Sequence, residues 1–186
     1  MTVTGIVLAA GAGTRMGMPK ALMRSKARRS ADAVAWLDTA VSVLEAAGCA
    51  PVVVVLGAAP DAPAPRTATV VVAEDWDTGM AASLRAGLAA ASGDAALITL
   101  VDLPGLPVAV AQRIAAGATD LSLTQAVFGG RPGHPVLIGS AHWDAVSRAI
   151  SGDRGARGYL VANGVVEIEC GDLWDGADID SAGIDS

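Results

Sequence analysis

The stretch that decides the fold is "LAAGAGTRMGMPK", residues 8–20, in which an apolar run is followed by three glycines, a proline and two cations, Arg15 between the glycines and Lys20 after them. The apolar residues 5–10 predict a first strand. Glycines directly after a strand let backbone N–H groups approach an anion and turn toward it. The stretch therefore predicts an α/β fold with a phosphate-binding loop after its first strand.

Three kinds of phosphate loop can be compared with this stretch. A P-loop is excluded because Gly17 is followed by Met18 instead of Lys and then Ser or Thr. A dinucleotide-binding turn needs a helix that continues out of the glycines, and Pro19 would break it. A loop that wraps a nucleoside triphosphate fits best, with Arg15 as a bidentate clamp and Lys20 as a point charge. The remaining alternative is a plain glycine turn with two surface cations.

Strand and helix patterns alternate through the first two thirds of the chain. Strands are expected at residues 5–10, 51–57, 67–73 and 95–101, and helices at residues 31–48, at 78–93 with Thr78 as its cap, and from Pro107 toward Gly117. Two strands around a Gly- and Pro-rich turn follow at 121–139, then short helices at 141–150 and 155–162 and an edge strand at 165–170. This alternation predicts one doubly wound, Rossmann-like α/β domain over residues 1–186, a three-layer sandwich with a mostly parallel sheet.

The charge of the chain is negative overall and unevenly distributed. The formal net charge of -6 argues against a nucleic-acid partner. Six of the 13 Lys and Arg residues precede Asp32, whereas residues after Arg157 include seven acids and no Lys or Arg. This pattern favours an anion site near the N-terminus and a cation site near the C-terminus. The alternative is a basic loop and a solvated acidic tail.

Cysteine use and hydropathy suggest a cytoplasmic protein. Cys49 and Cys170 have no metal-ligand spacing and are expected to be reduced thiols. No signal peptide opens the chain, and no apolar run reaches the ~18 residues of a membrane span, so no membrane contact is expected.

Motifs along the chain resemble those of a known family. "LAAGAGTRMGMPK" is similar to the signature of the MobA-like nucleotidyltransferases, and within that family to the molybdenum cofactor cytidylyltransferases. The similarity continues in family order through residues 77–88, 101–106, 129–139, 152–160 and 178–185. It covers nearly the whole chain and implies a fold of the nucleotide-diphospho-sugar transferase type.

The resemblance also assigns a nucleotide and metal site. It implies that the base lies against Leu8, Ala9, Ala10, Gly79 and Met80, and that Gly11, Gly13, Arg15 and Lys20 hold the phosphates. Asp102 would bind Mg²⁺ as the cofactor together with a second acid, for which Asp180 is favoured and Asp178 is the alternative. CTP is favoured because Ala10 stands where guanylyl-transferring relatives usually have Gly. Independently, Asp102 ends a predicted buried strand, where open α/β sheets bind ligands. The alternatives are a turn-capping Asp102 and a solvated tail at 178–185.

The implied reaction transfers a nucleoside monophosphate to a phosphorylated acceptor and releases pyrophosphate. By resemblance, Arg131, His134 and Arg157 bind the acceptor, a molybdopterin-type molecule, and a molybdoenzyme is a candidate partner. Arg131 and His134 are expected on a glycine-flexible loop. Where cytidylyltransferases usually have Asp-Gln-Pro, this chain has Asp102-Leu103-Pro104, so the acceptor stays open. The alternatives are an NAD(P)H-dependent oxidoreductase, as some relatives are named, and a nucleotide-binding chaperone without turnover.

Overall fold

Seven strands form one sheet in the computed structural model, which describes residues 1–25 and 33–179. Their order across the sheet is β3-β2-β1-β4-β6-β5-β7. The strands are β1 (Val3–Leu8), β2 (Val52–Leu56), β3 (Ala68–Val72), β4 (Ala95–Leu100), β5 (Leu123–Phe128), β6 (Arg131–Gly139) and β7 (Val166–Glu169). Only the pairings of β6 with β4 and β5 are antiparallel within this described sheet, so the expected mostly parallel sheet is confirmed.

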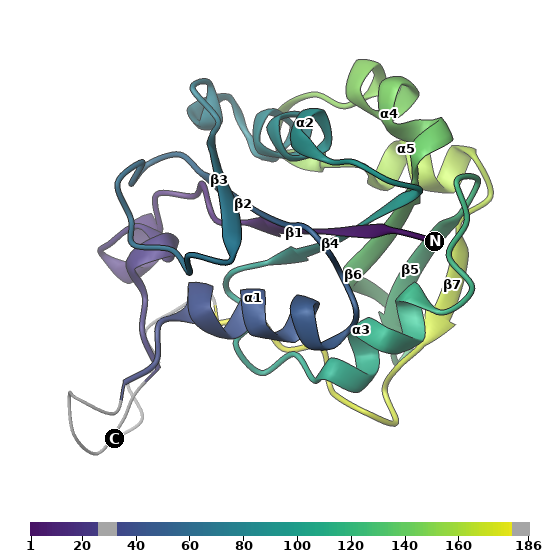
Figure 1. Ribbon diagram of the computed structural model, residues 1–186, viewed down its shortest axis with the longest axis horizontal. Coiled ribbons are helices and arrows are strands. Elements are labelled where there is room, and N and C mark those ends of the chain that lie inside the picture. Colours follow the sequence, from purple (N-terminus) through teal and green to yellow (C-terminus); the bar gives the residue numbers. More distant parts are fainter. Residues whose placement is uncertain (26–32, 180–186) are drawn as a thin grey trace.

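Helices cover both faces of the sheet. The α-helices are α1 (Trp36–Ala46), α2 (Met80–Ala90), α3 (Val108–Ala115), α4 (Trp143–Ala149) and α5 (Arg157–Ala162). α1 and α3 lie on one face, and α2, α4 and α5 lie on the other (Figure 1). The predicted doubly wound, three-layer α/β sandwich is therefore confirmed.

The central strands are built from aliphatic residues because both of their faces are covered. Every residue of β2 is buried, as are all but one residue in each of β1 and β4. Such continuous aliphatic runs are typical of parallel strands between two helical layers. The edge strands β3 and β7 are largely exposed, and β7 carries two glutamates.

The turn between β5 and β6 is shorter than the predicted loop. Only Gly129 and Gly130 separate the two strands, with φ angles of 58° and 74°. A two-residue hairpin turn with positive φ at both positions suits glycine. The expectation of a glycine-flexible loop around Arg131 and His134 is wrong, because both residues belong to β6.

Two helix starts also differ from expectation. α1 begins at Trp36, and its cap residue Ala35 has extended backbone, so the helix starts later than residue 31. Thr78 does not cap α2. Its hydroxyl donates to the Asp75 carbonyl at 2.7 Å inside a 3-10 turn, η4 (Trp76–Thr78), and Gly79, with φ of 120°, separates that turn from the helix.

Two expectations about the environment of the chain can be compared with the structure. Cys49 and Cys170 are both buried free thiols, as expected. Among the helices of the described residues, none has the length and apolar character needed to cross a membrane.

Candidate active site

The register between β1 and β4 brings two predicted parts of the site together. Leu8 pairs with Leu100, and the Val101 N–H donates to the Leu8 carbonyl at 3.1 Å. The glycine loop and Asp102 therefore leave the sheet side by side. β1 lies between β2 and β4, so the chain connections diverge at this point. Open α/β sheets bind their ligands in the crevice outside such a point.

The glycine loop folds back on itself instead of opening a long helix. Two 3-10 turns follow the glycines, η1 (Thr14–Met16) and η2 (Lys20–Leu22). The Lys20 N–H donates to the Gly11 carbonyl at 3.1 Å and closes the loop. This arrangement brings Lys20 back to the end of β1, from which the loop started.

Gly13 and Gly17 both have positive φ but differ in their surroundings. Their φ angles are 58° and 75°. A Cβ at Gly13 would lie 2.0 Å from the Met18 carbonyl oxygen, whereas a Cβ at Gly17 would meet nothing within 4 Å. Gly13 is therefore required both by its backbone angle and by the close return of the chain.

This difference makes a matched pair of variants informative. We expect Gly17→Ala to lower the free energy of unfolding by about 1 kcal/mol through backbone strain alone. Gly13→Ala should cost about 1–3 kcal/mol more, because the new methyl group overlaps a backbone oxygen. Urea unfolding of both variants checks this. Equal losses in the two variants would show that the close return at Gly13 contributes nothing.

Lys20 and Asp102 form the central charged pair of the site. The Lys20 ammonium donates to the Asp102 carboxylate. The Asp102 side chain is 7% exposed and that of Lys20 is 24% exposed. Because water screens such a pair only partly, the two opposite charges interact more strongly than on an open surface. The pair joins the end of the glycine loop to the end of β4.

A cleft of about 320 Å³ opens at this pair. Eight of the residues predicted for the nucleotide line it: Leu8, Ala9, Ala10, Gly11, Lys20, Gly79, Met80 and Asp102. They come from three separate segments of the sequence. The fold therefore gathers them around one cavity, although this placement does not test what they bind.

Gly13 and Arg15 are not among the lining residues. Gly13 does not line the cleft, but it permits the close approach of the Met18 carbonyl within the loop. Arg15 lies exposed on η1, between Gly13 and Gly17. Arg15 is therefore not part of the lining of the cleft.

Four polar or aromatic residues of the cleft were missed by the sequence analysis: Trp76, Asp77, Ser83 and Asp153. Asp153 belongs to a 3-10 turn, η6 (Gly152–Arg154), that packs against α2. A Cβ at Gly79 would lie 2.5 Å from the Gly152 carbonyl carbon, so glycine at 79 permits this contact. For Asp77, Ser83 and Asp153 the signal available in the sequence was their position inside the motifs at 77–88 and 152–160, and Trp76 directly precedes the first of these motifs.

A second cavity of about 190 Å³ adjoins the first, because Leu8 and Met80 line both. It contains His134 and Arg157, two of the three residues predicted for the acceptor. Arg154 and Gln125 line it as well, and the Gln125 amide donates to the Gly133 carbonyl at 3.2 Å. The second cavity thus combines a mostly apolar lining with two arginines, a histidine and an amide.

Arg131 lies elsewhere. It lines an open hollow of about 450 Å³ together with Asp175 and Asp178. Pro132 and Gly133 of β6 line both this hollow and the second cavity, so β6 lies between the two cavities. Alternate residues of a strand face opposite sides, which explains why Arg131 and His134 do not converge.

His134 is expected to be uncharged at neutral pH. Burial lowers the pKa of His134 from 6.5 to about 4, although the negative charge of Asp102 opposes the shift. Between these two pH values the unfolded chain binds a proton that the folded chain does not. The free energy of unfolding should therefore fall on acidification through this window, by up to about 1.4 kcal/mol per pH unit.

Urea unfolding between about pH 7 and pH 5 tests this contribution. His134→Gln should lose less stability on acidification than the unmodified chain. His142→Gln is the matched control, because it removes the second histidine of the chain and keeps His134. Identical pH dependence in the unmodified chain and His134→Gln would contradict the assignment.

A divalent cation at Asp102 would need oxygen ligands in addition to the carboxylates of the described residues. No group of three His, Cys, Asp or Glu side chains that could hold a metal occurs within residues 1–25 and 33–179. Asp180 lies outside the described residues, but the Ile179 N–H donates to the Asp102 carbonyl at 3.1 Å. Mg²⁺ typically takes one or two carboxylates and fills its shell with phosphates and water. Asp102 is compatible with such a site as one of its carboxylate ligands.

Comparison with known domains identifies the family. A model of the MobA-like NTP transferase domain matches residues 5–166 of the chain. The chain belongs to the MobA-like NTP transferase family. This membership makes it a protein of a nucleotidyltransferase family, in agreement with the resemblance of its motifs.

Individual relatives of this MobA-like protein match nearly the whole chain. Nicotine blue oxidoreductase of Paenarthrobacter nicotinovorans is 36% identical over 194 residues, covering 96% of this chain and 92% of that protein. The crystal structure of Rv0371c from Mycobacterium tuberculosis H37Rv is 29% identical with a TM-score of 0.77, covering 97% and 94% of the two chains. A manganese complex of Rv0371c is 27% identical with a TM-score of 0.70, covering 91% and 88%.

Proposed function

We propose that this MobA-like NTP transferase transfers CMP from CTP to a phosphate group of a molybdopterin-type acceptor and releases pyrophosphate. The observation that carries the proposal is the pair of adjoining cavities that share Leu8 and Met80. One contains the Lys20–Asp102 pair, and the other contains His134 and Arg157. Two substrates bound in these cavities would meet at the shared wall.

The proposed step needs no general base. An acceptor phosphate oxygen, already ionised at neutral pH, attacks the α-phosphorus of CTP and forms a new P–O bond. The bond from the α-phosphorus to the bridging oxygen breaks, and its electron pair leaves with pyrophosphate. Catalysis then consists of alignment and charge neutralisation. Lys20 and Arg15 would offset the charge that builds on the leaving pyrophosphate.

Asp102 would hold the divalent cation, with Asp180 as the second ligand. When bound, Mg²⁺ would neutralise phosphate oxygens and keep the attacking and leaving oxygens in line. The manganese complex of the related Rv0371c supports a divalent cation in this family. The Lys20 ammonium donates to the Asp102 carboxylate, which keeps this buried charge paired.

The choice of nucleotide and acceptor rests on the lining of the cavities. Ala9 and Ala10 present small side chains to the first cavity, and Ala10 stands where guanylyl-transferring members usually have Gly, which favours CTP. In the second cavity Arg154 and Arg157 suit a phosphate, and neutral His134 and Gln125 suit the polar edge of a pterin. A molybdoenzyme is the partner proposed to receive the product.

A second candidate function follows from the relative named nicotine blue oxidoreductase, which is 36% identical. It would make the chain an NAD(P)H-dependent oxidoreductase. The loop geometry argues against it, because the glycines lead into 3-10 turns and α1 begins only at Trp36. A dinucleotide-binding turn instead points the start of a continuous helix at the pyrophosphate.

One assay separates these functions. Pyrophosphate release is measured with each of the four NTPs, with Mg²⁺, and with a molybdopterin-type acceptor or none. Release with CTP that depends on the acceptor supports the proposal. CTP binding without release would indicate a nucleotide-binding chaperone. Saturable micromolar binding of NADPH in a fluorescence titration, without pyrophosphate release, would indicate the oxidoreductase.

A further inference from the structure

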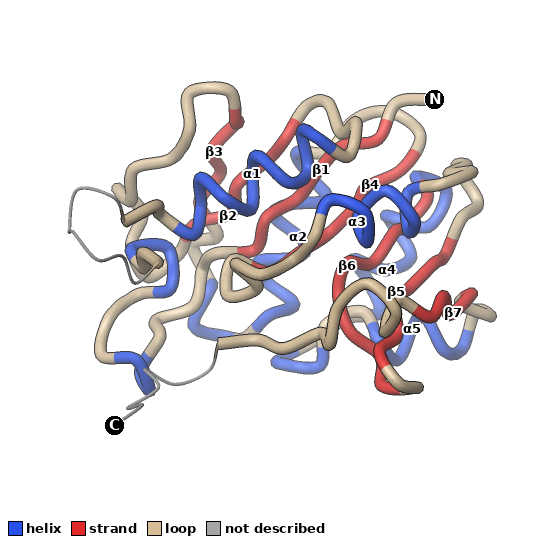
Figure 2. The backbone as a smooth tube through the Cα atoms, turned by 90° about the horizontal axis from the view of Figure 1, so that it is seen from below, coloured by secondary structure: helices blue, strands red, loops and turns tan. Residues whose placement is uncertain are grey.

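The chain after β7 returns to the candidate active site. We call residues 170–179 the C-terminal strap. At its start the Cys170 N–H donates to the Val127 carbonyl of β5 at 2.8 Å, and at its end the Ile179 N–H donates to the Asp102 carbonyl at 3.1 Å. The strap runs from the β7 side of the sheet back across the molecule (Figures 1 and 2). It therefore links the outer strands directly to the end of β4.

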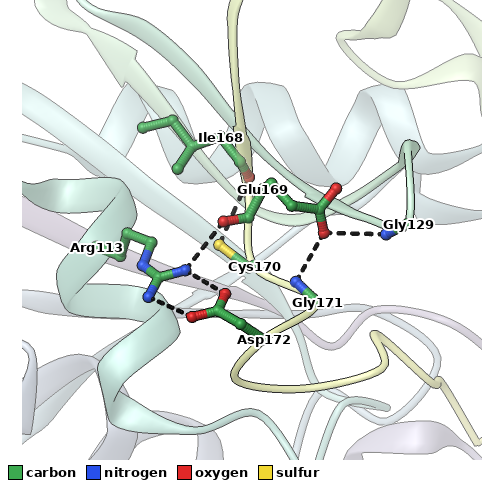
Figure 3. Close-up of polar contacts among 7 residues, drawn as sticks. All are labelled: Arg113, Gly129, Ile168, Glu169, Cys170, Gly171 and Asp172. Carbon is green, nitrogen blue, oxygen red and sulfur yellow. Dashed lines mark hydrogen bonds and ion pairs between the residues drawn. The ribbon is translucent and has the colours of Figure 1, made fainter.

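The strap is held at its start by an ion pair with α3. Arg113 donates to both carboxylate oxygens of Asp172, at 2.5 and 2.9 Å, and to the Glu169 carbonyl at 3.0 Å (Figure 3). A bidentate arginine–carboxylate pair fixes direction as well as distance. We call Arg113 and Asp172 the clasp.

A second set of contacts fixes the same point from the other side. The Glu169 carboxylate accepts backbone N–H bonds from Gly129 at 3.0 Å and Gly171 at 2.7 Å (Figure 3). It also accepts the Gly130 N–H at 3.2 Å. These bonds lower the pKa of Glu169, so the carboxylate stays ionised at neutral pH. The hairpin turn, the end of β7 and the start of the strap are thus tied to one side chain.

The middle of the strap packs on the loop that carries Asp102. The ring of Trp174 meets Phe128 edge to face, with 5.4 Å between centroids. A Cβ on Gly105, three residues after Asp102, would lie 3.4 Å from the Trp174 indole nitrogen. Gly176, with φ of 75°, turns the strap so closely over Phe128 that a Cβ would lie 2.4 Å from its ring. The strap thus reaches Asp102 both through this packing and through the Ile179 bond.

We propose that Arg113 and Asp172 are positioning residues whose ion pair holds the C-terminal strap against the Asp102 loop and so shapes the cation side of the nucleotide cleft. This inference rests on the proposed function, in which Asp102 holds a divalent cation. An edge strand alone would not need a strap that returns across the sheet. Groups that hydrogen-bond directly to a metal ligand typically change metal affinity by about 10- to 100-fold when they are removed. The clasp acts on Asp102 only through the strap, so we expect an effect at the lower end of this range.

Two clasp variants, Arg113→Ala and Asp172→Asn, test the proposal in the full chain. The probe is Mn²⁺ alone, titrated by electron paramagnetic resonance, and the second readout is hydrogen exchange of residues 101–106 and 170–179. Arg148→Ala is the matched control, because Arg148 is exposed on α4 in the other helical layer. A charge swap, Arg113→Asp with Asp172→Arg, tests whether the pair itself matters. Asp102→Asn serves as the reference for lost cation binding.

We expect both clasp variants to weaken Mn²⁺ binding about tenfold and to speed exchange at residues 101–106 about tenfold. The charge swap should recover part of both effects, and Arg148→Ala should show neither. Asp172→Asn is the milder change, because the Asp172 side chain is 60% exposed. This variant can therefore still be measured if Arg113→Ala does not fold.

The proposal and the function on which it rests fail in different ways. Clasp variants with a lower unfolding midpoint but unchanged Mn²⁺ affinity would overturn the positioning role, if Asp102→Asn still abolishes binding. Unchanged exchange at residues 101–106 would overturn it as well. Equal Mn²⁺ binding by the unmodified chain and Asp102→Asn would instead contradict the cation site of the proposed function.

Discussion

Asp102→Asn is expected to lower pyrophosphate release by about a thousandfold, with little change in the fold. Asparagine has nearly the same shape, but its neutral amide cannot supply the negative charge that a divalent cation requires. The backbone bond from Ile179 ends on the Asp102 carbonyl, so the substitution preserves it. Steady-state turnover with saturating CTP, acceptor and Mg²⁺ measures the loss, and circular dichroism checks the fold.

Asp120→Asn is the matched control for this variant. Asp120 is exposed and lies beside Gly139, which pairs with Ala95 at the opposite end of β4 from Asp102. The same chemical change there should leave turnover within about twofold of the unmodified chain. Full activity in Asp102→Asn would refute the role of this carboxylate.

Lys20→Met is expected to have the second large effect, lowering turnover about a hundredfold and raising the KM for the nucleotide. The substitution removes the cation from the proposed phosphate site and leaves the 7% exposed Asp102 carboxylate without this ammonium. A buried charge that loses its partner is costly, and because Lys20 is 24% exposed we expect about 1–3 kcal/mol of lost stability. Kinetics and urea unfolding of the same preparation measure both effects.

The double variant Lys20→Met with Asp102→Asn separates the two roles of the pair. It removes both charges at once, so it should be more stable than Lys20→Met alone. Its turnover should be no better than that of Asp102→Asn. A double variant whose loss of stability equals the sum of the single losses would show that the two side chains act independently.

The part of the site that follows from strand order and register could be predicted from the sequence. "GIVLAA" and "AALITLV" are aliphatic runs that require cover on both faces, so both are central parallel strands. Their carboxyl ends meet at one edge, and this places Asp102 beside the glycine loop. Because Lys20 ends the motif that begins at the same edge, the meeting of Lys20 and Asp102 was also within reach of the sequence.

Residues that depend on packing between distant segments could not be predicted in the same way. Asp153 reaches the first cavity because η6 packs against Gly79, a contact that no local pattern records. Trp76 lines the cleft because it belongs to the 3-10 turn that precedes α2. The direction of a side chain at the end of a turn depends on the neighbour it meets.

Strand geometry explains the remaining discrepancy on the acceptor side. Arg131 and His134 were expected on one flexible loop, which would allow both to converge. The two-residue Gly129–Gly130 turn instead makes Arg131 the first residue of β6, and residues three apart on a strand face opposite sides. Arg154, adjacent to Asp153 in η6, lines the second cavity together with Arg157.

A crystal structure of the chain with CTP and Mn²⁺ tests the central claim most directly, because the anomalous signal of manganese locates the cation without reference to activity. The account predicts a manganese peak at the Asp102 carboxylate, with the triphosphate between the glycine loop and Lys20 in the cleft of about 320 Å³. Nucleotide bound away from this cleft, or manganese bound with no contact to Asp102, would contradict it.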